Sequence, residues 1–219
     1  MKNNLARVEK RPAEQQALDN LRQFILAGNL KPGERLTEAA VAQQLGVSRA
    51  TVRTGMHRLA VEGILIQVPY TGWQVASISA KDVWELWTLR GSLEGLAARL
   101  VCQSLDPVGK KRIKAAFSAL KEAAYAGDIY AINQCDFNFH RTIVGMAGHG
   151  RLLDQYIMVE NQVSLYIAIS NKLLGTNFTD IIHQHAPLAK ALLNADTNLA
   201  QQEAWNHNQS EGKKLADSL

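Results

Sequence analysis

The chain has 219 residues, of which 47% are hydrophobic and 20% are charged, a composition that supports a packed core and excludes a disordered protein. Residues 1–80 carry 10 Lys and Arg against 6 Asp and Glu, whereas residues 81–219 carry 14 of each, so the whole net charge of +4 lies in the N-terminal part, as expected if that part alone meets phosphate. The sequence has no apolar run long enough to cross a membrane and no signal-peptide pattern at its start, so we expect a cytoplasmic protein with no membrane partner.

The first predicted element is an amphipathic helix that follows a flexible N-terminal tail over residues 1–14. Leu18, Leu21 and Ile25 recur at helical spacing and form one apolar stripe. Gly28 and the Pro-Gly pair at residues 32–33 end this helix.

Residues 37–53 predict two short helices joined by a tight turn, which is a helix-turn-helix. Gly46 permits the turn, and Ser48 is a good N-cap for the second helix. Arg49 and Arg53 lie four residues apart on one helix face, where guanidinium groups can reach phosphates or the O6 and N7 edge of guanine. We therefore expect the second helix to contact DNA.

A β-hairpin is predicted directly after this helix. Residues 64–68 and 73–75 have the composition of two strands, and residues 69–72 have that of the turn between them. A helix-turn-helix with a trailing hairpin is a winged helix, so we expect a winged helix-turn-helix DNA-binding domain over residues 15–77.

The rest of the chain, residues 78–219, shows no convincing strand pattern. Glycine, proline and Asp signals divide it into about six predicted helices, over residues 81–103, 107–126, 128–147, 150–171, 178–194 and 196–217. The expected fold is thus mainly α, an N-terminal winged helix-turn-helix followed by an all-α helical bundle. Cys102 and Cys135 have no partner spacing, and we expect two buried free thiols in a reducing compartment. Trp84, Trp87 and Trp205 are expected in the core or at an interface.

Within this bundle, a group of acidic and histidine residues has the chemistry of a metal site. Asp136 and His140 are four residues apart, hence on one helix face, and His185 and His207 on two later helices can complete the ligand set. Three imidazoles and one carboxylate suit a borderline divalent ion, zinc first, with nickel, manganese or iron as alternatives, and leave positions open for a ligand. The alternative is histidines that are exposed or hydrogen-bonded in the core. His183 lies about 200° around the helix from His185 and is expected at the surface.

The N-terminal motifs resemble the signature of the GntR family of bacterial transcriptional regulators. The matching residues fall in order over about fifty positions: Leu30–Leu36, Leu45–Arg49, Val52–Arg53, Arg58–Leu59, Glu62–Gly63 and Gly72. The resemblance implies DNA contacts from Arg35, Ser48, Arg49, Thr51 and Arg53, with Gly72 at the wing tip against the minor groove. Thr51 stands where the family usually has Pro.

The helical part is similar to the ligand-binding domain of the FadR branch of that family. The similarity rests on Arg90-x-x-Leu93-Glu94, Asp136-x-x-Phe139-His140, His185 and His207. It implies that Asp136 and the three histidines hold a metal and that Arg90 lies beside an effector pocket. About six helices place the chain nearer the VanR-like subgroup. His149 replaces a usual Asn and Gln184 replaces a usual acid.

These observations together predict a homodimeric, non-enzymatic regulator, with repression of transcription as the expected outcome. Its two winged helices are expected to bind a short palindrome in double-stranded operator DNA. A small carboxylate effector would bridge the metal and Arg90. Three alternatives stay open at this point: Arg90 forms only an ion pair with Glu94, the metal is purely structural, or the bundle is a metalloenzyme joined to a DNA-binding module.

Overall fold

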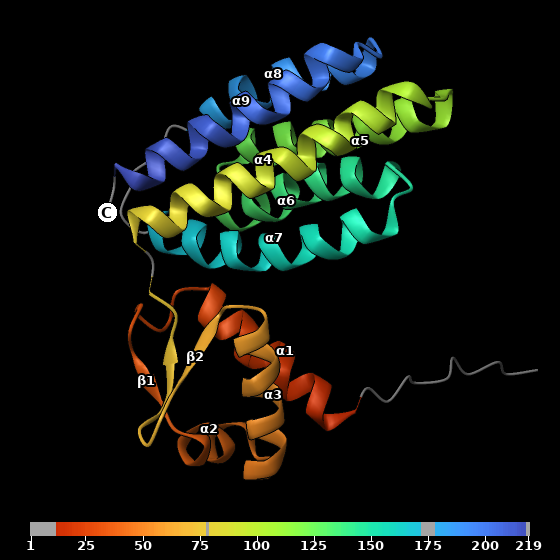
Figure 1. The fold of residues 1–219 in the computed structure, drawn as a ribbon. Coiled ribbons are helices and arrows are strands. Elements are labelled where there is room, and N and C mark those ends of the chain that lie inside the picture. Colours follow the sequence, from red (N-terminus) through yellow and green to blue (C-terminus); the bar gives the residue numbers. More distant parts are fainter. Residues whose placement is uncertain (1–11, 78, 172–177, 218–219) are drawn as a thin grey trace, which may run out of the picture. The chain divides into compact units, whose positions relative to one another are not determined.

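The computed structural model describes residues 12–77, 79–171 and 178–217. The chain divides into two compact units, with the boundary in the sequence between residues 77 and 78 (Figure 1). Most of the predicted tail, residues 1–11, lies outside the described residues. Helix α1 (Ala13–Leu26) begins inside the range predicted as tail, directly after Pro12, which occupies the N-cap position.

The first unit is a three-helix domain with a small sheet. It contains α1, β1 (Arg35–Leu36), α2 (Glu38–Leu45), α3 (Arg49–Val61), β2 (Leu65–Val68) and β3 (Gly72–Val75). The strands are antiparallel in the order β1-β3-β2, so β2 and β3 form the predicted hairpin. The two-residue strand β1 was not predicted, because two residues are too few to show an alternating pattern. Its pairing with β3 extends the hairpin to a third strand.

Local capping explains where the two helices of the helix-turn-helix begin. Thr37 Oγ1 accepts a hydrogen bond from Ala40 N (3.2 Å), and Ser48 Oγ accepts one from Thr51 N (3.1 Å). Gly46, between the helices, has φ of +66°, a left-handed conformation that glycine adopts without strain. On the inner side of α3, Val52, Met56 and Leu59 are buried.

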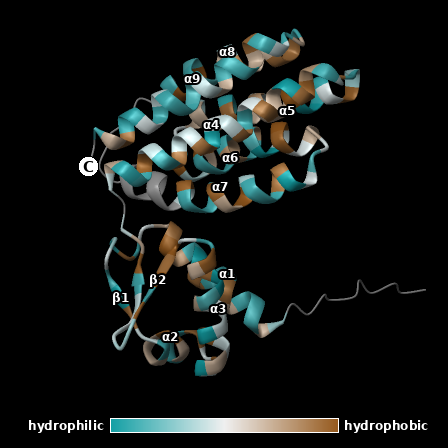
Figure 2. Ribbon diagram, viewed as in Figure 1, coloured by the Kyte–Doolittle hydropathy of each residue, from teal (hydrophilic) through white to brown (hydrophobic). Residues whose placement is uncertain are grey.

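The second unit is helical throughout its described residues and matches the predicted bundle. Its helices are α4 (Ala80–Gln103), α5 (Pro107–Ala126), α6 (Ile129–Met146), α7 (Gly150–Asn171), α8 (Asp180–Leu193) and α9 (Thr197–Ala216). Figure 2 shows hydrophobic and hydrophilic residues mixed along every helix of the bundle, as expected for helices with one buried face. Among the described residues, no helix is both long and apolar enough to span a membrane.

Helices α4 and α9 pack especially closely, and glycines make this possible. A Cβ atom added at Gly212 of α9 would lie 2.7 Å from Cβ of Trp87 on α4, well inside van der Waals contact. The Trp87 ring also meets the Trp205 ring edge-on at 5.4 Å. Trp87 is half-buried in this packed seam, whereas Trp205 and Trp84, also expected in the core or at an interface, are 36% and 57% exposed. This seam aligns α4 with α9, and both helices contribute to the site described next.

Candidate metal centre and DNA-binding surface

The four predicted metal ligands come together inside the bundle. Asp136 and His140 lie on α6, His185 on α8 and His207 on α9, and one ligand atom from each lies within 4.8 Å of the others. We call these four residues the histidine cluster. The three imidazoles are buried, and Asp136 is largely so. The alternative of surface histidines is therefore excluded for these three residues.

The polar contacts of the imidazoles indicate which ring nitrogens face the centre. His185 Nδ1 lies 2.7 Å from the carbonyl oxygen of Ile181, which can only accept, so Nδ1 carries the proton. His140 Nδ1 lies 3.0 Å from Glu94 Oε2 in an ion-pair contact. In the neutral rings both Nε2 atoms therefore present lone pairs, and these atoms are 3.0 Å apart.

Asp136 adds a third acceptor to the same point. Its Oδ1 lies 2.6 Å from His185 Nε2 and 3.5 Å from His140 Nε2. Among the described residues, Asp136 Oδ1 and His207 Nδ1 are buried and make no hydrogen bond of normal geometry. When the rings are neutral these acceptors converge without a donor, an arrangement that favours a cation between them, and one carboxylate with three imidazoles is a ligand set that fits a divalent transition-metal ion.

The electrostatics of the metal-free cluster lead to the same conclusion. Burial lowers the pKa of His140, but the Glu94 carboxylate and the contact with Asp136 raise it more, to about 9. Burial and the charges of His185 and His140 hold the pKa of His207 well below its usual range. At neutral pH His140 is thus protonated in the metal-free cluster, and its positive charge lies at the point where a cation would fit.

Glu94 is the residue that connects the cluster to the rest of the interior. It is 2% exposed and accepts hydrogen bonds at both oxygens. Arg90 Nε (2.7 Å) and the Tyr156 hydroxyl (3.1 Å) donate to Oε1, and Asn208 Nδ2 (2.7 Å) donates to Oε2, which also meets His140. Burial raises the pKa of Glu94, but Arg90 and His140 lower it more, so this carboxylate is ionised. A carboxylate behind a ligand histidine fixes the tautomer and orientation of the ring.

Sequence reasoning identified Glu94 only as an ion-pair partner of Arg90. That pair exists, so the simpler interpretation of Arg90 describes one of its contacts correctly. Arg90 is nevertheless 4% exposed, and its Nη2 atom has no hydrogen-bond partner in the described part of the chain. The contact of Glu94 with His140 could not be read from spacing, because it joins residues on two different helices.

The residues that depart from the family pattern have other structural roles. His149 Nδ1 accepts a hydrogen bond from Leu152 N (3.2 Å) and so caps the first turn of α7, as an Asn there would do. The Gln184 amide faces Glu211 and Lys214 on α9. His183 is exposed, as expected. Both cysteines are free, with Cys102 buried and Cys135 half-buried.

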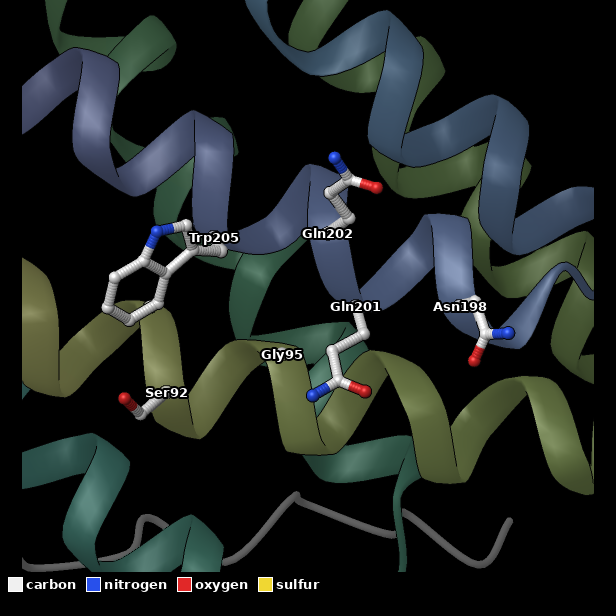
Figure 3. Close-up of a pocket in the computed structure, with 7 residues that line it drawn as sticks. Ser92, Gly95, Asn198, Gln201, Gln202 and Trp205 are labelled. Carbon is white, nitrogen blue, oxygen red and sulfur yellow. The ribbon is translucent and has the colours of Figure 1, made fainter.

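A separate pocket of about 560 Å³ lies between α4 and α9 (Figure 3). Its lining consists of Gly91, Ser92, Gly95, Asn198, Gln201, Gln202 and Trp205. Since none of these side chains is charged or titratable, the pocket offers neither a metal ligand nor a cation for a carboxylate. The histidine cluster is therefore the better candidate for effector chemistry.

The predicted DNA contacts lie on one domain, mostly as exposed side chains. Arg35, Ser48, Arg49 and Arg53 are exposed, whereas Thr51 is half-buried and its Oγ1 lies 2.9 Å from Ser48 Oγ. Gly72 starts β3 with φ of +104°, a conformation that favours glycine. Basic side chains at the start of an exposed helix, next to a β-hairpin, form a surface suited to a DNA groove.

Arg53 has a partner that sequence reasoning missed. Its Nε and Nη2 atoms donate to the Glu38 carboxylate at 2.8 and 2.7 Å, and Trp73 Nε1 donates to the same carboxylate at 3.4 Å. Because Glu38 occupies the Nε and Nη2 atoms of Arg53, only the remaining N–H groups of the guanidinium are free to contact DNA. These groups suit a phosphate better than the paired acceptors of guanine. The Glu38 pKa is lowered, first by the Arg53 hydrogen bonds.

Comparison with known proteins gives a family match for each of the two units. Residues 13–75 match the model of the bacterial regulatory proteins, gntR family, and residues 85–210 match the FCD domain. A probable D-xylose utilization operon transcriptional repressor of Paenarthrobacter nicotinovorans is 28% identical over 92% of this chain and 88% of its own. The gluconate operon transcriptional repressor of Bacillus subtilis is 27% identical over 82% of this chain and 75% of its own.

Solved structures show the same fold. McbR/YncC of E. coli superposes with a TM-score of 0.79 at 21% identity, over 95% of this chain and 99% of its own. A putative GntR regulator from Rhodococcus superposes with a TM-score of 0.78 at 21% identity, over 94% of this chain and 98% of its own. The chain therefore belongs to the GntR family of transcriptional regulators, with a GntR helix-turn-helix domain followed by an FCD domain, and it is not an enzyme.

Proposed function

We propose that the protein is a homodimeric repressor that releases its operator when a small carboxylate binds at a metal held by the histidine cluster. The observation that carries the proposal is the convergence of the two Nε2 atoms and Asp136 Oδ1 on one buried point. Two relatives in the comparison are named as operon repressors, which supports the direction of regulation.

Asp136, His140, His185 and His207 would hold the ion, with zinc as the first candidate. When bound, the metal supplies positive charge and an open position for an anionic oxygen. The protein's own residues prepare the site: Glu94 and the Ile181 carbonyl orient the rings of His140 and His185.

Arg90 is the residue proposed to bind the carboxylate from the protein side. Its Nε is committed to Glu94, which fixes the side chain, and its Nη2 remains available. A buried guanidinium with an unpaired N–H is a strong donor for a carboxylate oxygen. This preorganised donor, next to a divalent ion, favours a small carboxylic acid over a neutral ligand.

In the winged helix-turn-helix domain, we propose that five residues contact operator DNA: Arg35, Ser48, Arg49, Thr51 and Arg53. Gly72 would let the wing approach the minor groove. Two copies bound to a palindrome need only a change in the separation of their recognition helices to lose affinity. Effector coupling of about 1–3 kcal/mol, or roughly 5–150-fold, is typical for such switches.

The test uses the full-length, zinc-loaded protein and its operator in a fluorescence anisotropy titration. A carboxylic acid that raises the melting temperature should weaken operator binding by roughly 5–150-fold. Arg49→Ala should weaken operator binding by about 1–3 kcal/mol while changing non-operator binding less, if it contacts a base. An acid that binds the protein and leaves operator affinity unchanged refutes the proposed regulation.

A further inference from the structure

Outside the histidine cluster, two buried polar atoms of opposite character are left without partners among the described residues of the bundle. Arg90 Nη2 is a donor and Glu160 Oε1 is an acceptor, and neither makes a hydrogen bond within the described residues. Their residues are 4% and 1% exposed. Native proteins rarely leave such a buried group unpaired, because its lost hydrogen bonds to water are not replaced. The pair therefore calls for an explanation.

Both residues border the same interior. Arg90 Nε donates to Glu94 Oε1, and the Tyr156 hydroxyl donates to that same oxygen. Tyr156 and Glu160 are four residues apart on α7, hence on one helix face. The pKa of Glu160 is raised, because burial outweighs the opposing effects of Arg141, Arg90 and His140. Glu160 thus lies within electrostatic range of the histidine cluster.

Glu160 is also held in place from the outer side. Arg141, whose side chain is 55% exposed, donates from Nε to Glu160 Oε2 at 3.0 Å. This pair joins α6 to α7, which accounts for one oxygen of Glu160 and leaves Oε1 unexplained. A purely structural ion pair would not require burying the second oxygen without a donor.

We propose that the effector is a carboxylic acid carrying a second group with a polar hydrogen, either a hydroxyl or an ammonium. Its carboxylate accepts from Arg90 Nη2, and its second group donates to Glu160 Oε1. The inference rests on the proposed function, because it assigns the effector to the same site. It adds Glu160 as the residue that selects between plain and substituted acids.

Selection follows from the cost of an unpaired acceptor. A plain aliphatic acid satisfies Arg90 but leaves Glu160 Oε1 unpaired, whereas a hydroxy or amino acid satisfies both. Sites that hydrogen-bond a hydroxyl or amine discriminate strongly against analogues that lack it. We expect at least a tenfold difference in dissociation constant between matched acids.

The experiment is calorimetric titration of the zinc-loaded, full-length protein with matched acids of three to six carbons, each as the plain, hydroxy and amino acid. We expect one substituted series to bind at least tenfold more tightly than the plain series. Glu160→Met, which removes the acceptor at similar volume, should abolish that preference. Arg141→Met, which breaks the ion pair but keeps the Glu160 carboxylate, is the matched control and should retain it.

The two proposals fail in different ways. If plain and substituted acids bind equally well to the wild-type protein, the effector site stands and the role of Glu160 is overturned. A preference that persists in Glu160→Met overturns it as well. If no acid in the panel binds, the proposed function itself is wrong and this inference falls with it. The wild-type comparison needs no variant, so misfolding of a variant cannot decide the outcome.

Discussion

Replacing Glu94 with glutamine changes one carboxylate oxygen to an NH₂ group at a point where four other side chains contact it. In the wild-type protein, the carboxylate accepts from Arg90, Tyr156 and Asn208 and meets His140 Nδ1. An amide can keep the contacts on one side only. If its oxygen faces Arg90 and Tyr156, its NH₂ group faces His140 and the NH₂ group of Asn208.

Two consequences follow, each with its own magnitude. An NH₂ group facing His140 Nδ1 favours the tautomer with the proton on Nε2, the atom that points into the histidine cluster, so metal affinity should fall about 10–100-fold. Arg90 is fully buried and loses its counter-charge, and breaking a buried pair in this way costs about 3–5 kcal/mol. Because the amide oxygen still accepts a hydrogen bond from Arg90, we expect the loss of stability to lie toward the lower end of this range.

The assay combines zinc affinity, measured by competition with a chromophoric chelator, with urea unfolding of the metal-free protein. Glu85→Gln is the matched control, because Glu85 lies on the same helix in an exposed pair with Lys81 and should change neither quantity by much. If Glu94→Gln binds zinc as tightly as the wild-type protein and unfolds within about 1 kcal/mol of it, the assigned role of Glu94 is wrong.

Three further predictions concern DNA binding, pH and packing. Arg53→Gln removes the guanidinium proposed to meet phosphate, so the salt dependence of non-operator DNA binding should become shallower by about 0.9 in log–log slope. An unchanged slope would show that Arg53 does not meet phosphate. The pKa of His140 is raised from 6.5 to about 9, so protonation of this residue stabilises the metal-free protein. That stabilisation is complete below pH 6.5 and is lost as the pH rises to about 9. Urea unfolding with a chelator should show this decline on a scale of a few kcal/mol, and a flat profile contradicts it. Gly212→Ala places a methyl group against Trp87 and should lower the free energy of unfolding by about 1–3 kcal/mol. The control Gly145→Ala, with no atom within 4 Å of the added methyl, should stabilise α6 by about 0.5–1 kcal/mol. Similar melting temperatures for the two variants would refute the packing argument.

The elements that the sequence predicted correctly are those with strong local signals. The helix-turn-helix is determined by Ser48, Gly46 and an apolar face within about seventeen residues, and the bundle helices begin at Asp or Ser caps such as Asp106 and Asp128. The residues of the histidine cluster were proposed from an i, i+4 pair on α6 and two histidines on later helices, and the family resemblance supported that choice; their metal binding stays a prediction. These signals need no knowledge of how distant segments meet.

The features that sequence reasoning missed depend on contacts between distant segments. Glu94 orients His140 across 46 positions of the chain, and Glu38 holds Arg53 across the turn of the helix-turn-helix. Glu160 looks like an ordinary acidic residue of an amphipathic helix until burial shows one of its oxygens without a partner. A single sequence carries the periodicity of each helix but not the pairing of its polar side chains.

The central claim is that a carboxylate binds through a metal held by the histidine cluster. Thermal melting of zinc-loaded and metal-stripped protein, each titrated with the matched acids, tests it most directly. Ligand at a hundred times its dissociation constant adds about 2.7 kcal/mol of stability, which a melting curve resolves easily. We predict that one class of acid raises the melting temperature of the zinc-loaded protein and not that of the stripped protein. Equal shifts with and without zinc, or stabilisation by zinc alone with no response to any acid, would contradict the claim.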